Sequence, residues 1–76
     1  PRVKARLHDG PGGTYLWVAN PTRQELPVRL EFGEHWGPFA SAHSLWGAEA
    51  SVDGRVLTLT AGARDVAVIA LERPKA

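Results

Sequence analysis

The segment 15–32 limits the possible folds of this chain more than any other stretch. Two apolar runs flank a polar turn that contains proline, and this pattern is typical of an antiparallel β-hairpin. The same stretch contains no nucleophile–base pair, no metal-ligand spacing and no glycine-rich phosphate loop. It therefore predicts strands and points to no particular reaction.

Strand patterns continue on both sides of this segment. Val3, Ala5 and Leu7 alternate with basic side chains, which is the period of a half-buried strand. Apolar residues alternate with charged ones again over 28–32. Pro27 should lie at the start of that strand or on an unpaired edge, because proline cannot donate a hydrogen bond to a neighbouring strand.

The second half of the chain is less regular but still β-like. Residues 40–45 predict either a loop or a short strand. Asp53 and Gly54 give the strongest hairpin signal, since both residues tolerate a positive φ. Alternation over 55–60 predicts a further strand, and the continuous apolar run 66–71 is typical of a central strand covered on both faces.

Together these patterns predict about seven short strands and no helix. The expected fold is all-β, either a small antiparallel β-sandwich or a Greek-key barrel. The predicted strands give an expected core that contains Leu16, Val18, Val28, Leu30, Leu57, Leu59, Val66 and Val68.

Composition fits a single domain over 1–76. The chain has 76 residues, of which 43% are hydrophobic, and no cysteine, so no disulfide can stabilise so small a core. Because methionine is absent and the chain begins at Pro1, we expect the C-terminal portion of a longer polypeptide. A single Asn and a single Gln, with seven Arg among nine basic residues, are typical of a thermophile. The lack of cysteine favours a cytoplasmic location without fixing it.

The charge pattern argues against nucleic acid and membrane partners. The formal net charge is only +1, and the acidic and basic residues are interspersed, whereas nucleic-acid-binding domains usually have a clustered basic excess. Arg2, Lys4 and Arg6 alternate as the solvent-exposed face of a strand would. No apolar run approaches the roughly 18 residues of a membrane span.

The residues that could carry chemistry are scattered. A zinc site needs three or four converging ligands, and the spacing of His8, His35 and His43 does not predict one. The aspartates lie in turn signals, where their side chains bond to the backbone: Asp9, Asp53 and Asp65. We therefore expect no catalytic residues, no metal and no cofactor, and a chain that is not an enzyme by itself.

Aromatic side chains are the remaining candidates for a site. Trp17 and Tyr15 share one face of the second predicted strand, while Trp36 and Trp46 lie beside glycines in the irregular region. These four residues could contact carbohydrate by stacking, or they could pack in the core and against a neighbouring domain.

Several segments in order resemble a known family. The sequences Tyr-Leu-Trp-Val-Ala-Asn-Pro-Thr (15–22) and Leu-Pro-Val-Arg-Leu (26–30) precede Ser-Leu-Trp-Gly (44–47). Asp-Gly-Arg-Val-Leu-Thr-Leu-Thr (53–60) and Ala-Arg-Asp-Val-Ala-Val-Ile-Ala-Leu (63–71) follow. This order resembles the C-terminal antiparallel β-domain that follows the catalytic barrel in α-amylase-like, α-galactosidase-like and β-galactosidase-like glycoside hydrolases.

The resemblance implies a non-catalytic domain. In that family the catalytic carboxylates belong to the barrel, so none is assigned to this sequence, and Ala61-Gly62-Ala63 departs from the proline that often precedes the last strand. The implied partner is the catalytic domain of the same polypeptide, which the β-domain would stabilise. The alternatives are a carbohydrate-binding module that binds an oligosaccharide through Trp36 and Trp46, and a protein-interaction β-sandwich.

Overall fold

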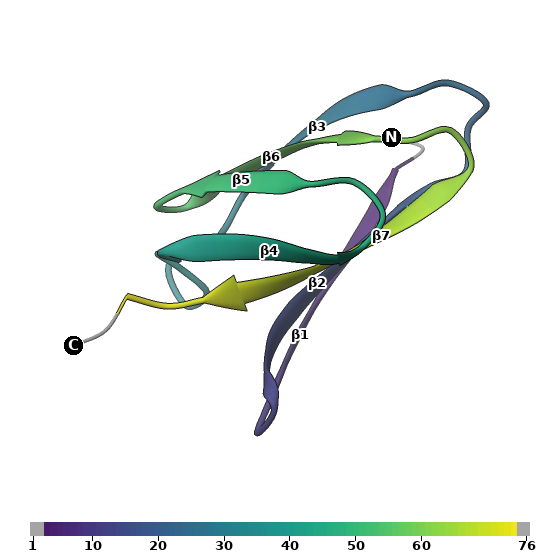
Figure 1. Ribbon diagram of the computed structural model, residues 1–76. Coiled ribbons are helices and arrows are strands. Elements are labelled where there is room, and N and C mark those ends of the chain that lie inside the picture. The colour runs from purple at the N-terminus through teal and green to yellow at the C-terminus, as the bar shows by residue number, and fades with distance from the viewer. Residues whose placement is uncertain (1–2, 75–76) are drawn as a thin grey trace.

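The computed structural model describes residues 3–74 and shows seven β-strands with no helix between them (Figure 1). Arg2, which the sequence pattern assigns to the first strand, lies outside the described residues. The strands are β1 (Lys4–Gly10), β2 (Gly13–Asn20), β3 (Leu26–Glu31), β4 (Ser41–Trp46), β5 (Ala50–Asp53), β6 (Val56–Ala61) and β7 (Asp65–Glu72). The all-β prediction is confirmed, and residues 41–46 form a strand and not a loop.

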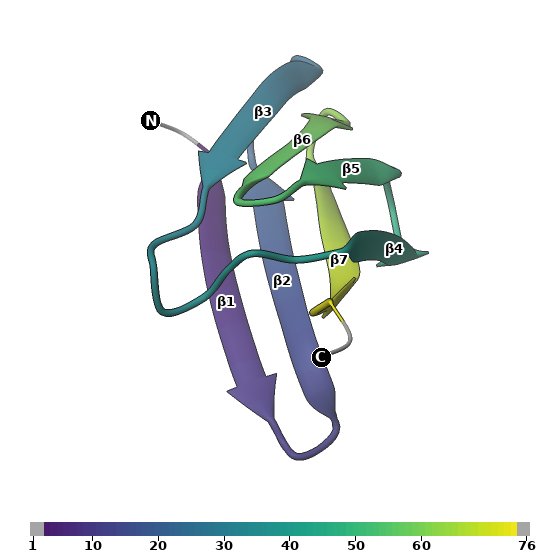
Figure 2. The ribbon, with the colours of Figure 1, turned by 90° about the vertical axis from the view of Figure 1, so that its left-hand side faces the viewer.

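The strands form two antiparallel sheets that pack as a small β-sandwich (Figures 1 and 2). Sheet A has the order β1-β2-β7-β4, and sheet B has the order β3-β6-β5. As expected, Pro27 lies near the start of an edge strand, and β7 is a central strand. Apart from the hairpins β1–β2 and β5–β6, each connection carries the chain from one sheet to the other.

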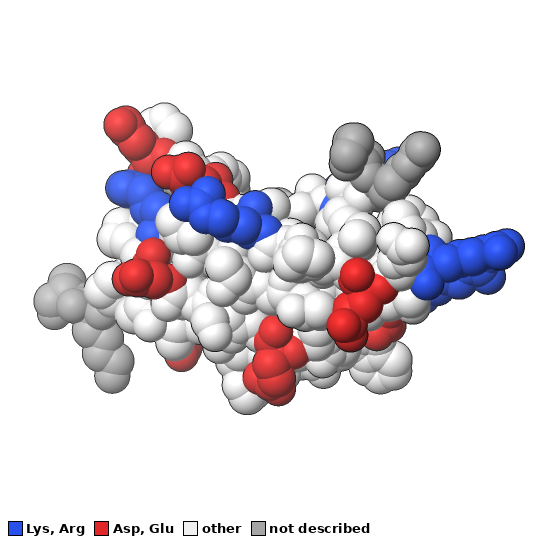
Figure 3. Space-filling view, turned by 90° about the horizontal axis from the view of Figure 1, so that it is seen from above, with Lys and Arg blue, Asp and Glu red and all other residues white. Residues whose placement is uncertain are grey.

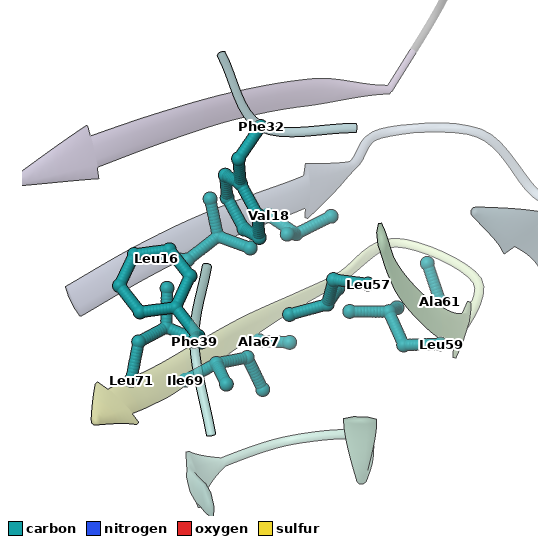
Figure 4. Packing of buried hydrophobic residues seen from close by; sticks show 10 residues of the cluster. All are labelled: Leu16, Val18, Phe32, Phe39, Leu57, Leu59, Ala61, Ala67, Ile69 and Leu71. Carbon is teal, nitrogen blue, oxygen red and sulfur yellow. The ribbon is translucent and has the colours of Figure 1, made fainter. Parts of the chain in front are cut away.

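The core lies between the sheets and is assembled from alternate residues of the central strands (Figure 4). Val18, Leu57 and Ile69 are completely buried. The buried hydrophobic residues are Leu16, Val18, Phe32, Phe39, Leu57, Leu59, Ala61, Ala67, Ile69 and Leu71. Val28 and Leu30 are partly buried against this cluster, so of the predicted core only the residues of β7 are misplaced.

The β7 prediction fails because its apolar run has no alternation to show which face is buried. Ala67, Ile69 and Leu71 point into the sandwich, whereas Val66 and Val68 point outward. Val66 is 37% exposed. The central strand therefore has an apolar outer face that no other described segment covers, contrary to the expectation that both faces would be covered.

The hairpin between β5 and β6 also differs from its prediction by one residue. Asp53 pairs with Val56, so the two loop residues are Gly54 and Arg55. Only Gly54 has a positive φ, of 62°. A glycine at the first loop position with an ordinary φ at the second is the pattern of a type II′ turn, in which Asp53 can remain in the strand.

Two phenylalanines close the core where the chain crosses from β3 to β4. The rings of Phe32 and Phe39 meet edge to face, with centroids 4.9 Å apart and an interplanar angle of 76°. Their backbone N–H groups donate to the carbonyls of Arg55 and Gly54, at 2.7 and 2.8 Å. The irregular connection is thus fixed to the β5–β6 turn at both ends.

Asn20 joins the two sheets at the opposite turn. It is only 1% exposed, and its Nδ2 lies 2.8–3.2 Å from the carbonyl oxygens of Gln24, Ala61 and Gly62. Its Oδ1 accepts hydrogen bonds from the backbone N–H and the hydroxyl of Thr22. One side chain therefore satisfies buried backbone groups that follow β2 and end β6.

Candidate functional site

The outer face of sheet A is the most unusual surface of the molecule. Strand alternation sends every second side chain of its four strands away from the core. Leu16 and Val18 of β2 are buried, for example, while Trp17 between them is 53% exposed. We use "outer face of sheet A" for Lys4, Arg6, His8, Tyr15, Trp17, Ala19, His43, Trp46, Val66, Val68 and Ala70.

The strand register places two tryptophans in one row across this face. Trp17 is paired with Arg6 on one side and with Val68 on the other, and Val68 is paired with Trp46. Trp17 and Trp46 are separated by two strand spacings, or about 10 Å. Trp46 is 68% exposed. An aliphatic side chain thus lies between two exposed aromatic ones.

One side of the face is basic. Lys4, Arg6 and His8 extend from β1 and line a hollow of about 800 Å³ together with Trp17 and Val66. In the described part of the chain, neither Lys4 nor Arg6 has a carboxylate within salt-bridge distance. The apolar centre of the face therefore has a positively charged border along β1.

Tyr15 contributes less than its position suggests. Its hydroxyl donates a hydrogen bond to the carbonyl of Gly12, at 3.0 Å, and the ring is half-buried. The side chain therefore packs over the β1–β2 turn, and its polar atom already has a partner within the molecule.

Trp36 does not belong to this face. It lies in the turn that follows β3, where its backbone N–H donates to the carbonyl of Gly33, at 3.0 Å. The neighbouring Gly37 packs against Arg55 of the β5–β6 turn. Of the four aromatic candidates, the structure brings together Trp17, Trp46 and Tyr15, and it places Trp36 in the connection between the sheets.

The outer face of sheet B has a different character. Its exposed residues alternate with the core residues of β3, β5 and β6, and include Pro27, Arg29, Glu31, Ser51, Asp53, Thr58 and Thr60. Seen from the side of β3 and β6, basic and acidic side chains are interspersed (Figure 3). Such a surface is suited to contact with water.

Of the three aspartates in turn signals, Asp9 and Asp65 have local structural partners. Asp9 accepts a hydrogen bond from the Thr14 hydroxyl at 2.7 Å and pairs with Arg73 at 3.6 Å. Asp65 accepts from the backbone N–H of Val66. Within residues 3–74, no group of three or more His, Cys, Asp or Glu side chains converges on a point. No helix that could cross a membrane occurs in the same range.

The sequence interpretation missed Lys4, Arg6, Val66 and Val68 as members of a common surface. The sequence signal for this surface was the run 66–71, in which the residues of both strand faces are apolar. Because sheet B packs against only one face of sheet A, the other apolar face of this strand stays exposed. Comparison with protein-family models, with curated proteins and with solved structures found no match to this chain. The resemblance to glycoside hydrolase C-terminal domains thus has no support from relatives and stays a prediction.

Proposed function

We propose that this chain is a non-catalytic β-sandwich domain that packs against another domain through the outer face of sheet A. In line with the sequence resemblance, we propose that the other domain is the catalytic domain of a glycoside hydrolase in the same polypeptide. Packing would stabilise both domains. The observation that carries the proposal is the exposure of Trp17, Trp46 and Val66 on one sheet face.

Burial of this face provides the driving force. Covering a large apolar side chain contributes about 1.5–3 kcal/mol, and contiguous exposed apolar surface on a small domain typically marks a contact site. Aromatic residues are also enriched in protein interfaces, and the borders of such interfaces are usually polar.

Oligosaccharide binding is the second candidate, because Trp17 and Trp46 are exposed on the same face. A sugar site also needs polar side chains that orient the ligand. The side chain paired between the two tryptophans is Val68, and the neighbouring outer positions of β7 are Val66 and Ala70. These aliphatic groups favour a protein partner over a sugar.

The test compares two pairs of substitutions in the isolated chain and in the longer polypeptide that the proposal requires. One pair is Trp17→Gln with Trp46→Gln, on the outer face of sheet A. The matched control is Thr58→Gln with Thr60→Gln, on the exposed face of β6. In the isolated chain, each pair should change the free energy of unfolding by about 1 kcal/mol or less, as expected for exposed strand positions.

In the longer polypeptide only the tryptophan pair should separate the β-domain from its neighbour. Calorimetry would then show a separate, earlier unfolding transition for the β-domain. Equal behaviour of the two pairs, or a polypeptide with no second domain, would contradict the proposal. A saturable quench of tryptophan fluorescence by millimolar neutral oligosaccharide, lost in the tryptophan pair, would instead establish a carbohydrate-binding module.

A further inference from the structure

The four edge strands of the sandwich are not equally protected against pairing with another chain. Exposed edges are usually protected by proline, by a bulge, by short length or by charged side chains. β3 contains Pro27, β5 has only four residues, and β4 has an irregular register between Ser44 and Trp46. Each of these three edges is therefore a poor template for a further strand.

β1 has no proline, no bulge and is not short, so the charges of Lys4 and Arg6 are its protection. Its seven residues pair with β2 in unbroken register, from Lys4 opposite Ala19 to Gly10 opposite Gly13. The β3–β4 connection passes on this side of the molecule (Figure 2), but among residues 3–74 no backbone hydrogen bond joins it to β1. All residues of β1 except Leu7 are exposed. The outward backbone groups of β1 therefore have no backbone partner among the described residues.

The side chains of β1 define what could pair there. Lys4, Arg6 and His8 point to the outer face, about 6.6 Å apart along the strand. Leu7 points to the core and packs against it. A strand laid beside β1 would thus meet basic side chains on one face and a hydrophobic edge on the other.

A second copy of this chain matches that edge less well than an acidic strand does. If two β1 strands paired antiparallel with their core faces on the same side, a register centred on Arg6 would place Arg6 opposite Arg6, and a register centred on Ala5 would place Arg6 opposite Lys4. Like charges directly opposite each other destabilise a strand pair. A strand with carboxylates at alternate positions would instead place opposite charges across from Lys4 and Arg6.

We infer that β1 accepts an added strand from a partner protein, with alternating acidic and apolar residues. Main-chain hydrogen bonds would supply affinity, and the charge pattern would supply selectivity, as in other cases of strand addition. The inference rests on the backbone edge of β1, whose Lys4 and Arg6 also border the outer face of sheet A, whereas the proposed packing function rests on Trp17, Trp46 and Val66, so either can fail alone.

The test uses the full 76-residue chain, labelled with ¹⁵N, and a synthetic capped peptide of alternating Val and Glu that matches the length of β1. Amide hydrogen exchange should slow at alternate residues of β1 when the peptide is added. A peptide of the same charge, N-methylated along the edge that faces β1, should give no protection, because it lacks the N–H donors.

The charge requirement is tested by a reversal. The Lys4→Glu/Arg6→Glu variant should bind the acidic peptide roughly tenfold more weakly and should gain affinity for the matching Val–Lys peptide. Since both positions are exposed, the variant should keep the amide spectrum of a folded chain away from β1.

Several results would overturn the inference. Unchanged amide exchange in β1 at millimolar peptide would exclude strand addition. Equal binding of the N-methylated peptide would show that charge attraction alone causes the binding. Perturbations centred on Trp17 and Trp46 would assign the peptide to the outer face. Protection of β1 that depends on protein concentration, without peptide, would show that a second copy occupies the edge.

Discussion

The outer faces of the two sheets differ although they belong to the same sandwich. On sheet B the outward positions are largely threonine, serine and charged residues, as at Thr58 and Thr60 of β6. On sheet A they include Trp17, Trp46 and Val66. Since neither set contributes to the core between the sheets, the fold itself does not explain the difference.

The contrast suggests that the two faces meet different surroundings. A polar outer face loses nothing in water, whereas an apolar one exposes surface whose burial would be favourable. A strand alternates apolar and polar residues when one of its faces packs on the core and the other meets water. A strand that is covered on both faces has no need of polar positions. The break of alternation in β7 therefore marks the face that we propose is covered in the working protein.

The largest expected effect concerns Asn20, whose hydrogen bonds connect the two sheets and so fix the positions of their outer faces. Asn20→Ala should lower the free energy of unfolding by about 3–5 kcal/mol, because it removes the side chain that donates to the buried carbonyl of Ala61 and the part-buried carbonyl of Gly62 and leaves a cavity at a fully buried position. Urea unfolding followed by tryptophan fluorescence measures the change.

The matched control is Gln24→Ala, which removes an exposed side chain and keeps the backbone carbonyl that Asn20 contacts. It should change stability by less than about 0.5 kcal/mol. Equal effects of the two substitutions would mean that Asn20 does not hold the sheets together.

The next effect compares the two sides of one strand. Ile69→Ala should cost about 2–5 kcal/mol, because Ile69 is fully buried between the sheets. Val68→Ala, at the neighbouring outward position, should cost about 1 kcal/mol or less in the isolated chain. Chemical denaturation of both variants gives the difference, and similar losses would show that the outer face of β7 is already covered within the chain.

A smaller difference in stability should distinguish Arg73, which contacts other side chains, from Arg6, which has no carboxylate partner among the described residues. Arg73 donates to the Thr14 hydroxyl at 3.0 Å and its guanidinium lies 5.4 Å from the centroid of the Phe39 ring. Arg73→Ala should therefore cost about 1 kcal/mol. Arg6→Ala, on the basic border of sheet A, should change stability by less than about 0.5 kcal/mol. Thermal unfolding of the two variants measures both losses of stability. A larger loss for Arg6→Ala than for Arg73→Ala would contradict the finding that Arg6 lacks an ion-pair partner among the described residues.

Much of this architecture was predictable from local patterns. Period-two alternation predicted β1 and β3, the β-branched and aromatic run before the Asn-Pro-Thr turn predicted β2, and the turn itself followed from residues with strong local preferences. The donation of the Asn20 side chain to Ala61 and Gly62 was not predicted, since that contact joins segments about forty residues apart in the sequence.

The candidate site was predicted only in part, for a specific physical reason. Trp17 and Tyr15 were correctly placed on one face because β2 alternates. Trp46 joins them only through the pairing of β4 with β7, and strand order is not encoded in local periodicity. The apolar run of β7 gave no indication of which residues point inward, so Val66 and Val68 were assigned to the core.

The most direct test of the covered-face proposal is hydroxyl-radical footprinting of the tryptophans, read by mass spectrometry, in the isolated chain and in the longer polypeptide. Trp17 and Trp46 should be oxidised readily in the isolated chain and several-fold more slowly in the longer polypeptide. Trp36, which is 38% exposed and lies off this face, provides the internal reference and should react equally in both. Equal oxidation of Trp17 and Trp46 in the two samples would contradict the account.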